Sequence, residues 1–243
     1  MSKVEVSIQF LNAVEWHTRA ACDFTLTSGV DVWRIDINAN ARYIDKLLTT
    51  LQPDEVARAN RYLQERDRTR FIVSRASLRH IIGKYTNQPE AAITFTVGAN
   101  KKPYVDGHSL KYNVSHSGNW VVIAVANSDI GADTETIDHT FPYQSILSDN
   151  FSDAEADFIG QSAEKFYLLW TRKEALTKAT GQGLDDNLQH IPCLDGQQTA
   201  DNRLLLTEKN WQVKSFNLDN KNIASVVAEA DAAGMSFFEM GFM

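Results

Sequence analysis

The sequence has little cysteine, no long apolar run and a shortage of positive charge. Only two cysteines, Cys22 and Cys193, occur in 243 residues, and neither stands in a CxxC or other zinc-ligand spacing. No segment stays apolar over the ~20 residues that a helix needs to cross a bilayer, and the N-terminus has no apolar signal-peptide core. We therefore expect a reduced, cytoplasmic protein with no disulfide framework and no membrane partner.

The charge balance argues against nucleic acid as a partner. Lys and Arg number 24 against 31 Asp and Glu, which gives a net charge of −7. A protein that binds nucleic acid by neutralising phosphates normally carries an excess of positive charge. A local basic pocket remains compatible with this composition. At 243 residues, the chain is long enough for one large domain or two small ones.

The first half of the chain has a recognisable order of expected elements. Residues Val32 to Asn38 alternate apolar and polar side chains, which is typical of a half-buried strand. Pro53, followed by two acidic residues, is typical of the first turn of a helix. Residues 68–85 form a longer helical pattern for which Gly83 is a plausible end, and residues 110–126 predict two strands around a Ser-Gly-Asn turn.

The same order recurs in the second half. Residues 130–138 are strand-like, and Ser152 with Glu155 three residues later has the spacing of a helical capping box. Residues 165–183 predict a helix with a glycine-rich end, and residues 211–230 predict a second two-strand ribbon.

A nearly constant offset relates the two series of elements. The separations are 97, 98, 98 and 100 residues for the pairs Asp36 and Asp133, Asp54 and Ser152, Arg75 and Lys173, and Ser115 and Ser215. This regularity favours a duplication. We expect an α/β (α+β) protein with two pseudo-symmetric subdomains, residues 1–127 and 128–243, and a ligand site in the cleft between them. One chain then supplies both sides of the cleft, which favours an active monomer.

Two acidic residues stand close together at the start of the second half. Asp133 and Glu135 are two apart on the expected strand, so both carboxylates point to one face. Such like charges repel unless a cation or hydrogen bonds compensate. Gly131 permits a close backbone approach beside them. On these residues alone, a solvated face of an edge strand is the favoured alternative.

Glu174 and Lys178 change that balance. They are four apart on the helix over 165–183, on a different face from its apolar stripe. One alternative is a surface ion pair worth a few tenths of a kcal/mol. The other is that the helix delivers a third carboxylate and a cation to the site of Asp133 and Glu135. Three oxygen ligands with open positions suit Mg²⁺.

Ser115 and His116 do not make a good nucleophile and base pair. They are adjacent on an extended segment, so their side chains diverge, and a hydrolase triad is disfavoured. At a strand end they are better placed to contact a phosphate. Several basic residues are candidates for the same pocket, each with a solvated surface position as its alternative: Lys101, Lys102, Arg58, Arg70, Arg75 and Arg79.

Four motifs occur in an order that resembles one enzyme family. They are "KKPY" from Lys101, "YNVSHSG" from Tyr112, "IGADTE" from Ile130 and "WTRKEALTKATGQGL" from Trp170. The last two contain GxDxE and WxxKExxxK. Together with NxSHS, these motifs resemble the Sfp-type 4′-phosphopantetheinyl transferases over nearly the whole chain. The resemblance implies two similar α/β subdomains with the active site between them.

The resemblance also implies a reaction. The family transfers the 4′-phosphopantetheine arm of coenzyme A to a serine hydroxyl of an apo acyl or peptidyl carrier protein. The second product is adenosine 3′,5′-bisphosphate, and the reaction needs Mg²⁺. Such carriers serve fatty-acid, polyketide and non-ribosomal peptide biosynthesis. The open alternatives are a Mg²⁺-dependent phosphohydrolase and a non-catalytic nucleotide-binding module, although the intact acids and Lys178 argue against the latter.

Specific roles follow from the resemblance, residue by residue. The metal ligands would be Asp133, Glu135 and Glu174, with Glu174 also the candidate base for the serine proton. Lys178 would bind the coenzyme A pyrophosphate and stabilise the leaving phosphate. The coenzyme A contacts would otherwise be Arg58, Lys102, Ser115 and His116.

Two features stay open at this point. Glu155 matches a family glutamate that positions the metal water or the incoming serine, and the capping box is its alternative. The Phe- and Met-rich tail, Met235–Met243, either packs on the core or presents a contact surface to the carrier. In the second case, deleting the tail should leave coenzyme A binding intact.

Overall fold

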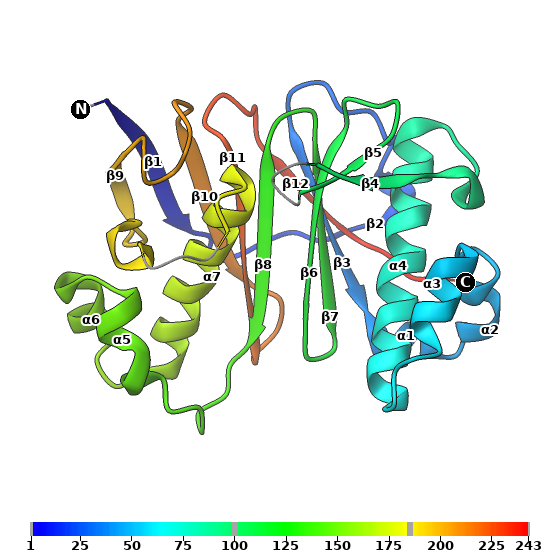
Figure 1. Cartoon of the computed structure of the whole chain (residues 1–243), viewed down its shortest axis with the longest axis horizontal. Coiled ribbons are helices and arrows are strands. Elements are labelled where there is room, and N and C mark those ends of the chain that lie inside the picture. The colour runs from blue at the N-terminus through cyan, green and yellow to red at the C-terminus, as the bar shows by residue number, and fades with distance from the viewer. Residues whose placement is uncertain (1, 99–101, 184–186, 243) are drawn as a thin grey trace.

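Two five-stranded sheets form the centre of the molecule, and helices cover them (Figure 1). The computed structural model describes residues 2–98, 102–183 and 187–242. The first sheet has the order β8-β11-β10-β1-β9, made of Ile130–Thr136, Asn222–Glu229, Trp211–Asn217, Lys3–Phe10 and Gly196–Asp201. The second has the order β2-β12-β3-β7-β6, made of His17–Thr18, Met235–Glu239, Val30–Asp36, Trp120–Ala126 and Lys111–Ser117. A two-stranded sheet pairs β4 (Phe95–Val97) with β5 (Pro103–Val105).

Each half has one long helix and several short ones. The first half contains α1 (Ile37–Ala41), α2 (Ile44–Leu48), α3 (Pro53–Ala59) and α4 (Glu65–Thr86). The second half contains α5 (Leu147–Asn150), α6 (Asp153–Ile159) and α7 (Ala163–Thr180). Short 3₁₀ turns stand at Arg19–Ala21, Glu90–Ala92, Tyr143–Ile146 and Leu188–His190. Within the described residues, no helix is both long and apolar enough to cross a membrane.

The two long helices pack on different sheets. Buried side chains of α4, including Ile72 and Ala76, share a core with Trp33 and Ile123 of the second sheet. Those of α7 pack against β8 and β11 of the first sheet. In Figure 1, β8 and β6 stand side by side in the middle of the molecule, between α7 and α4. The predicted fold class, two similar α/β halves, is confirmed.

The terminal strands cross between the two halves. β1 lies between β10 and β9 in the first sheet, although it comes from the N-terminus. β12 comes from the C-terminal tail and pairs in parallel with β3 in the second sheet. The division into 1–127 and 128–243 therefore does not describe sheet membership at either end. Sequence order alone gives no sign of this exchange, because each terminal strand completes a sheet that is distant in sequence.

The tail packs on the core. Phe237, Phe238 and Met240 are buried, and the ring centroid of Phe238 lies 4.9 Å from that of Trp33 in a stacked arrangement. Packing, one of the two alternatives for this segment, is therefore confirmed. The contact-surface alternative is wrong for these three side chains, because their apolar area is already covered.

Two expected helix ends have different outcomes. α7 ends at Gly181, which has a φ of 76° and suits a left-handed C-cap. α4, however, continues through Gly83 and ends at Asn87 with a φ of 51°. Gly83 serves a close approach instead, since a Cβ there would lie 2.8 Å from the Gln88 carbonyl oxygen.

Candidate active site

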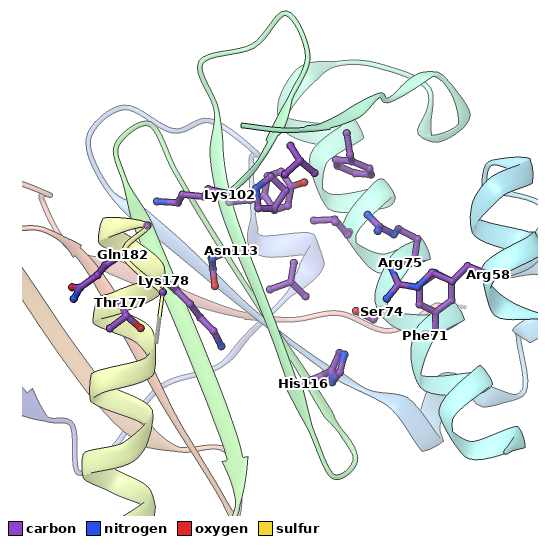
Figure 2. Close-up of a pocket in the computed structure, with 18 residues that line it drawn as sticks. Arg58, Phe71, Ser74, Arg75, Lys102, Asn113, His116, Thr177, Lys178 and Gln182 are labelled. Atoms are coloured by element: carbon purple, nitrogen blue, oxygen red, sulfur yellow. The ribbon is translucent and has the colours of Figure 1, made fainter. Parts of the chain in front are cut away.

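A pocket of about 910 Å³ lies between the two halves. This volume is within the range of small-molecule sites. α4, β4 and β5 provide one wall, the C-terminal end of α7 provides the other, and β6 lies between them (Figure 2). Its lining residues are Arg58, Phe71, Ser74, Arg75, Leu78, Phe95, Val97, Lys102, Pro103, Tyr112, Asn113, Val114, His116, Thr177, Lys178, Gly181, Gln182 and Gly183.

Cationic side chains face this pocket from both walls. Figure 2 shows Arg58 and Arg75 on the α4 side, Lys178 on the α7 side and His116 between them. The Arg58 guanidinium lies 4.9 Å from the ring centroid of Phe71, which holds it over an aromatic face. Removal from water, with smaller contributions from Arg70, Lys178 and Arg58, lowers the pKa of His116. A neutral His116 can accept a proton when an anion binds beside it.

Lys102 links the two walls. Its Nζ donates a hydrogen bond of 2.7 Å to the Ala179 carbonyl oxygen near the end of α7 and lies 3.4 Å from Asp129 Oδ1. Burial lowers the pKa of Lys102, and Asp129 partly compensates. The predicted basic residue therefore lines the pocket and also ties the loop before β5 to α7. Lys101, named with it as a candidate, lies outside the described residues.

Asp133 is held at the junction of β8 and α7. Its side chain is nearly buried, and Oδ1 accepts hydrogen bonds from Lys178 Nζ at 2.6 Å and Ser115 Oγ at 2.9 Å. Its Oδ2 is buried and has no partner. The close approach of α7 depends on Gly131, where a Cβ would lie 2.0 Å from the Ala175 carbonyl oxygen. Lys178 therefore reaches the acid site, as the second alternative predicted.

Three carboxylates share an unfavourable electrostatic environment. Burial, with Asp133 as the next cause, raises the pKa of Glu135 to about 7. Burial also raises the pKa of Glu174, where Lys178 opposes and Asp133 adds to the shift. Burial raises the pKa of Asp133 itself, against Lys178 and Ser115. A bound cation would relieve this mutual repulsion.

The fit of this cluster to a divalent cation can be tested on its donor atoms. Within the described ranges, no three His, Cys, Asp or Glu side chains converge as a preformed metal cage. The unpartnered Asp133 Oδ2 nevertheless leaves one buried carboxylate oxygen available. Carboxylate oxygens are the ligands that Mg²⁺ prefers. The donor chemistry of Asp133, Glu135 and Glu174 is compatible with Mg²⁺, and their role as its ligands stays a prediction.

Ser115 does not line the pocket. Its hydroxyl is buried, donates to Asp133 Oδ1 and accepts a hydrogen bond of 3.2 Å from the Thr134 backbone N–H. Its neighbour His116 points the other way and does line the pocket. The two adjacent side chains diverge, as their positions on a strand predict. The Ser115 hydroxyl therefore faces Asp133 and Thr134 and not the pocket. Its expected contact with coenzyme A stays a prediction.

Glu155 also lies apart from the pocket. Both bonds of its capping box with Ser152 are present, and its carboxylate forms an ion pair of 2.8 Å with Lys173 Nζ. Its Oε1 accepts hydrogen bonds from the Cys193 backbone N–H and Sγ, both at 3.0 Å. The capping alternative is confirmed. The catalytic alternative conflicts with this geometry, because both carboxylate oxygens are buried and engaged.

Some pocket residues had not been anticipated. Phe95, Tyr112, Asn113 and Thr177 line the wall. Ser117 lies outside the pocket lining, and it and Asn113 bond to the edge of β8. The two-residue period of β6 carried a signal for Asn113 and Ser117, since they share a face with Ser115. Nothing local marks Phe95, because its position depends on how β4 and β5 fold over α4.

Comparisons with known proteins identify the family of the chain. Residues 38–128 match the family model "4′-phosphopantetheinyl transferase, N-terminal", and residues 129–228 match "4′-phosphopantetheinyl transferase superfamily". The chain is 33% identical to 4′-phosphopantetheinyl transferase psf-1 of Bacillus pumilus, over 80% of this chain and 86% of that protein. It is 32% identical to 4′-phosphopantetheinyl transferase HetI of Nostoc sp., over 65% of this chain and 71% of that protein. It is 26% identical to 4′-phosphopantetheinyl transferase Sfp of Bacillus subtilis, over 58% of this chain and 64% of that protein.

Proposed function

Because the chain belongs to the 4′-phosphopantetheinyl transferase superfamily and is a transferase of the Sfp type, we propose the reaction that it catalyses. It transfers the 4′-phosphopantetheine arm of coenzyme A to a serine hydroxyl of an apo acyl or peptidyl carrier protein. Adenosine 3′,5′-bisphosphate is the second product, and the reaction depends on Mg²⁺. The partner is a carrier of fatty-acid, polyketide or non-ribosomal peptide biosynthesis.

One observation carries this proposal. One pocket joins a cationic and aromatic wall from the first half to Lys178 of the second half, and Lys178 in turn contacts Asp133 of the acid site. Coenzyme A requires both surfaces, because it carries an adenine ring, a 3′-phosphate and a pyrophosphate. A pocket of about 910 Å³ has room for its nucleotide end.

Different basic residues of the pocket would bind the 3′-phosphate and the pyrophosphate of coenzyme A. Arg58 and Arg75, on the α4 wall, would hold the 3′-phosphate, with Lys102 along the nucleotide. His116 and Lys178 would hold the pyrophosphate near Asp133. Charge neutralisation and in-line positioning are the main requirements of phosphoryl transfer.

The acids would hold the cation. Asp133, through the unpartnered Oδ2, would be joined by Glu135 and Glu174. When bound, Mg²⁺ supplies charge neutralisation on the pyrophosphate. Lys178 Nζ already touches the Asp133 carboxylate, so it can stabilise negative charge that develops on the leaving phosphate.

The reaction forms one P–O bond and breaks another. The carrier serine oxygen bonds to the phosphorus next to pantetheine, and the bridging P–O bond breaks. Its electron pair leaves with adenosine 3′,5′-bisphosphate. Glu174, whose raised pKa improves its basicity, accepts the serine proton. The attacking hydroxyl belongs to the partner, so the enzyme needs no nucleophile of its own.

We place this reaction in the cytoplasm and assign it to a monomer, since both walls of the pocket come from one chain. Nucleic acid and membranes have no part in it.

Intact mass spectrometry tests the proposal. A panel of apo-carriers is incubated with the protein, coenzyme A and Mg²⁺. We expect a gain of about 340 Da, the mass of the transferred arm, on at least one carrier. The gain must disappear when the carrier serine is replaced by alanine and when EDTA is added. Cleavage of coenzyme A without labelling of any carrier would contradict the proposal.

A further inference from the structure

The edges of the two sheets meet without a backbone ladder. β6 is the last strand of the second sheet and β8 is the first strand of the first sheet. They lie in contact, yet neither is paired with the other. An unpaired strand edge leaves backbone N–H groups without partners, which is costly in a buried position. Side chains of β6 supply those partners here.

Three alternate residues of β6 accept the free N–H groups of β8. Asn113 Oδ1 accepts from Ala132 at 3.0 Å, Ser115 Oγ from Thr134 at 3.2 Å, and Ser117 Oγ from Thr136 at 3.0 Å. We call these three bonds the edge ladder. The offset is 19 residues each time, so the two strands run in parallel and their register is fixed by side chains.

The two serines make a second bond that the asparagine does not make. Ser115 Oγ donates to Asp133 Oδ1 at 2.9 Å, and Ser117 Oγ donates to Glu135 Oε2 at 3.0 Å. Each hydroxyl therefore accepts from one residue of β8 and donates to the carboxylate just before it. A hydroxyl has one proton to donate. Ser115 directs it to Asp133, and Ser117 makes its shorter bond to Glu135, with Thr136 Oγ1 as a second acceptor at 3.3 Å.

We propose that Ser115 and Ser117 are positioning residues that orient the acid site from the other half of the molecule. The proposal rests on the proposed function only in taking Asp133 and Glu135 as cation ligands. Ser115, together with Lys178, occupies Asp133 Oδ1 and leaves Oδ2 buried without a partner. Ser117 does the same for one oxygen of Glu135. The acid site is thereby complete only when β6 and β8 are in register.

Mn²⁺ binding to the whole protein, followed by electron paramagnetic resonance, tests this role without coenzyme A or turnover. Ser115→Ala and Ser117→Ala should each weaken Mn²⁺ binding by about tenfold or more, as is usual for groups that orient metal ligands. Ser117→Thr keeps the hydroxyl at a partly exposed position and should restore the affinity. Asn113→Ala is the matched control, since it loses a ladder bond but touches no acid.

The comparison separates positioning from stability. Thermal unfolding of the metal-free variants reports the loss of ladder bonds, and we expect a similar decrease for Asn113→Ala and Ser115→Ala. Only the serine variants should lose Mn²⁺ affinity. The proposal would be overturned if Asn113→Ala lost as much Mn²⁺ affinity as the serine variants. It would also be overturned if Ser115→Ala and Ser117→Ala both kept the wild-type affinity. Absence of Mn²⁺ binding by the wild type would also overturn it, whereas carrier labelling by the same preparation would show that the transferase reaction stands.

Discussion

Both halves of the molecule hold a buried glutamate in the same way, whereas the acid site of Asp133, Glu135 and Glu174 belongs to the second half. Glu55 closes the capping box of α3 and forms an ion pair of 2.7 Å with Arg79. Glu155 closes the capping box of α6 and forms an ion pair of 2.8 Å with Lys173. All four side chains are buried.

The basic partner fixes a neighbouring turn in each half. Each donates to two carbonyl oxygens three residues apart: Arg79 to Glu90 and Ile93, and Lys173 to Leu188 and Ile191. The arrangement recurs in the half that lacks the acid site. The ion pair is therefore a structural feature of both halves, and we assign Glu155 a structural role.

The chemistry distinguishes the halves at β3 and β8. Asp36, which the sequence offset pairs with Asp133, is the last residue of β3 and caps α1 through Ala39 N–H. It also accepts a hydrogen bond of 2.7 Å from Asn119. Asp133 lies in the middle of β8, meets Lys178 and keeps one oxygen unpartnered. The two aspartates therefore occupy different positions on their strands, a helix cap in the first half and the acid site in the second.

Removing the exchanged terminal strand should have the largest effect. Deletion of residues 235–243 removes β12 and exposes the core beside β3. Burial of Phe237, Phe238 and Met240 is worth about 1.5–3 kcal/mol each, which together approaches the whole stability of a typical domain. We expect loss of the cooperative unfolding transition, measured by circular dichroism. If the deletion variant folded and bound coenzyme A normally, the tail would not be needed for the core.

Asp133 and Asp36, which the sequence offset pairs, give the next largest contrast. Asp133→Asn should lower carrier labelling by about 100-fold or more, because the acid site loses a charge. Asp36→Asn should leave labelling intact, since asparagine is an equally good helix cap. Initial rates of labelling measure both. Equal rates for Asp133→Asn and the wild type would remove Asp133 from the acid site.

The two capping glutamates should respond alike. Glu55→Gln and Glu155→Gln each leave a buried cation unpaired, at a cost of about 3–5 kcal/mol in the free energy of unfolding. Urea denaturation measures this loss, and labelling is compared under conditions where each variant is folded. A stable Glu155→Gln protein that does not label its carrier would return Glu155 to the catalytic site.

The acids of the second half should also make stability depend on pH. The pKa of Glu135 is raised from 4.5 to about 7, so the folded protein binds this proton more tightly than the unfolded chain. The folded state is then favoured at low pH, and that contribution is lost as pH rises from 4.5 through about 7. With EDTA present, we expect the free energy of unfolding to fall by about 2 kcal/mol over this pH range, after allowance for solvent screening.

Glu135→Gln isolates this contribution. In this variant, the free energy of unfolding from urea denaturation should fall less as the pH rises, because Glu135 no longer contributes. Mg²⁺ added to the wild type above pH 7 should restore the stability that Glu135 costs there. Identical pH profiles for the wild type and Glu135→Gln would show that the three carboxylates do not interact as described.

Local patterns predicted the elements and the chemistry of the acids, because both depend on neighbouring residues. The capping box at Glu155 and the close approach at Gly131 were predicted in this way. The convergence of Lys178 on Asp133 was one of two alternatives, and only the family resemblance favoured it, because the two residues are 45 apart in sequence. The terminal exchange was not, since β1 and β12 pair with strands far away in sequence.

The repeat offset was wrong in detail. It matched Lys173 with Arg75, which does pair with Glu55 at 3.2 Å, but Arg79 makes the shorter pair and the two carbonyl bonds that Lys173 also makes. It also matched Asp54 with Ser152, whereas the two helix caps are Gln52 and Ser152. The position of Ser115 was similarly hidden, because its partners on β8 depend on how the two sheet edges meet.

The central claim is that the first half holds the nucleotide while the second half holds the cation and pyrophosphate. A crystal structure with coenzyme A and Mg²⁺ tests it most directly. We predict the adenosine end against Arg58 and Arg75, the pyrophosphate at Lys178, and the cation on Asp133 Oδ2. Coenzyme A bound outside this pocket, or a cation that does not touch Asp133, would contradict the claim.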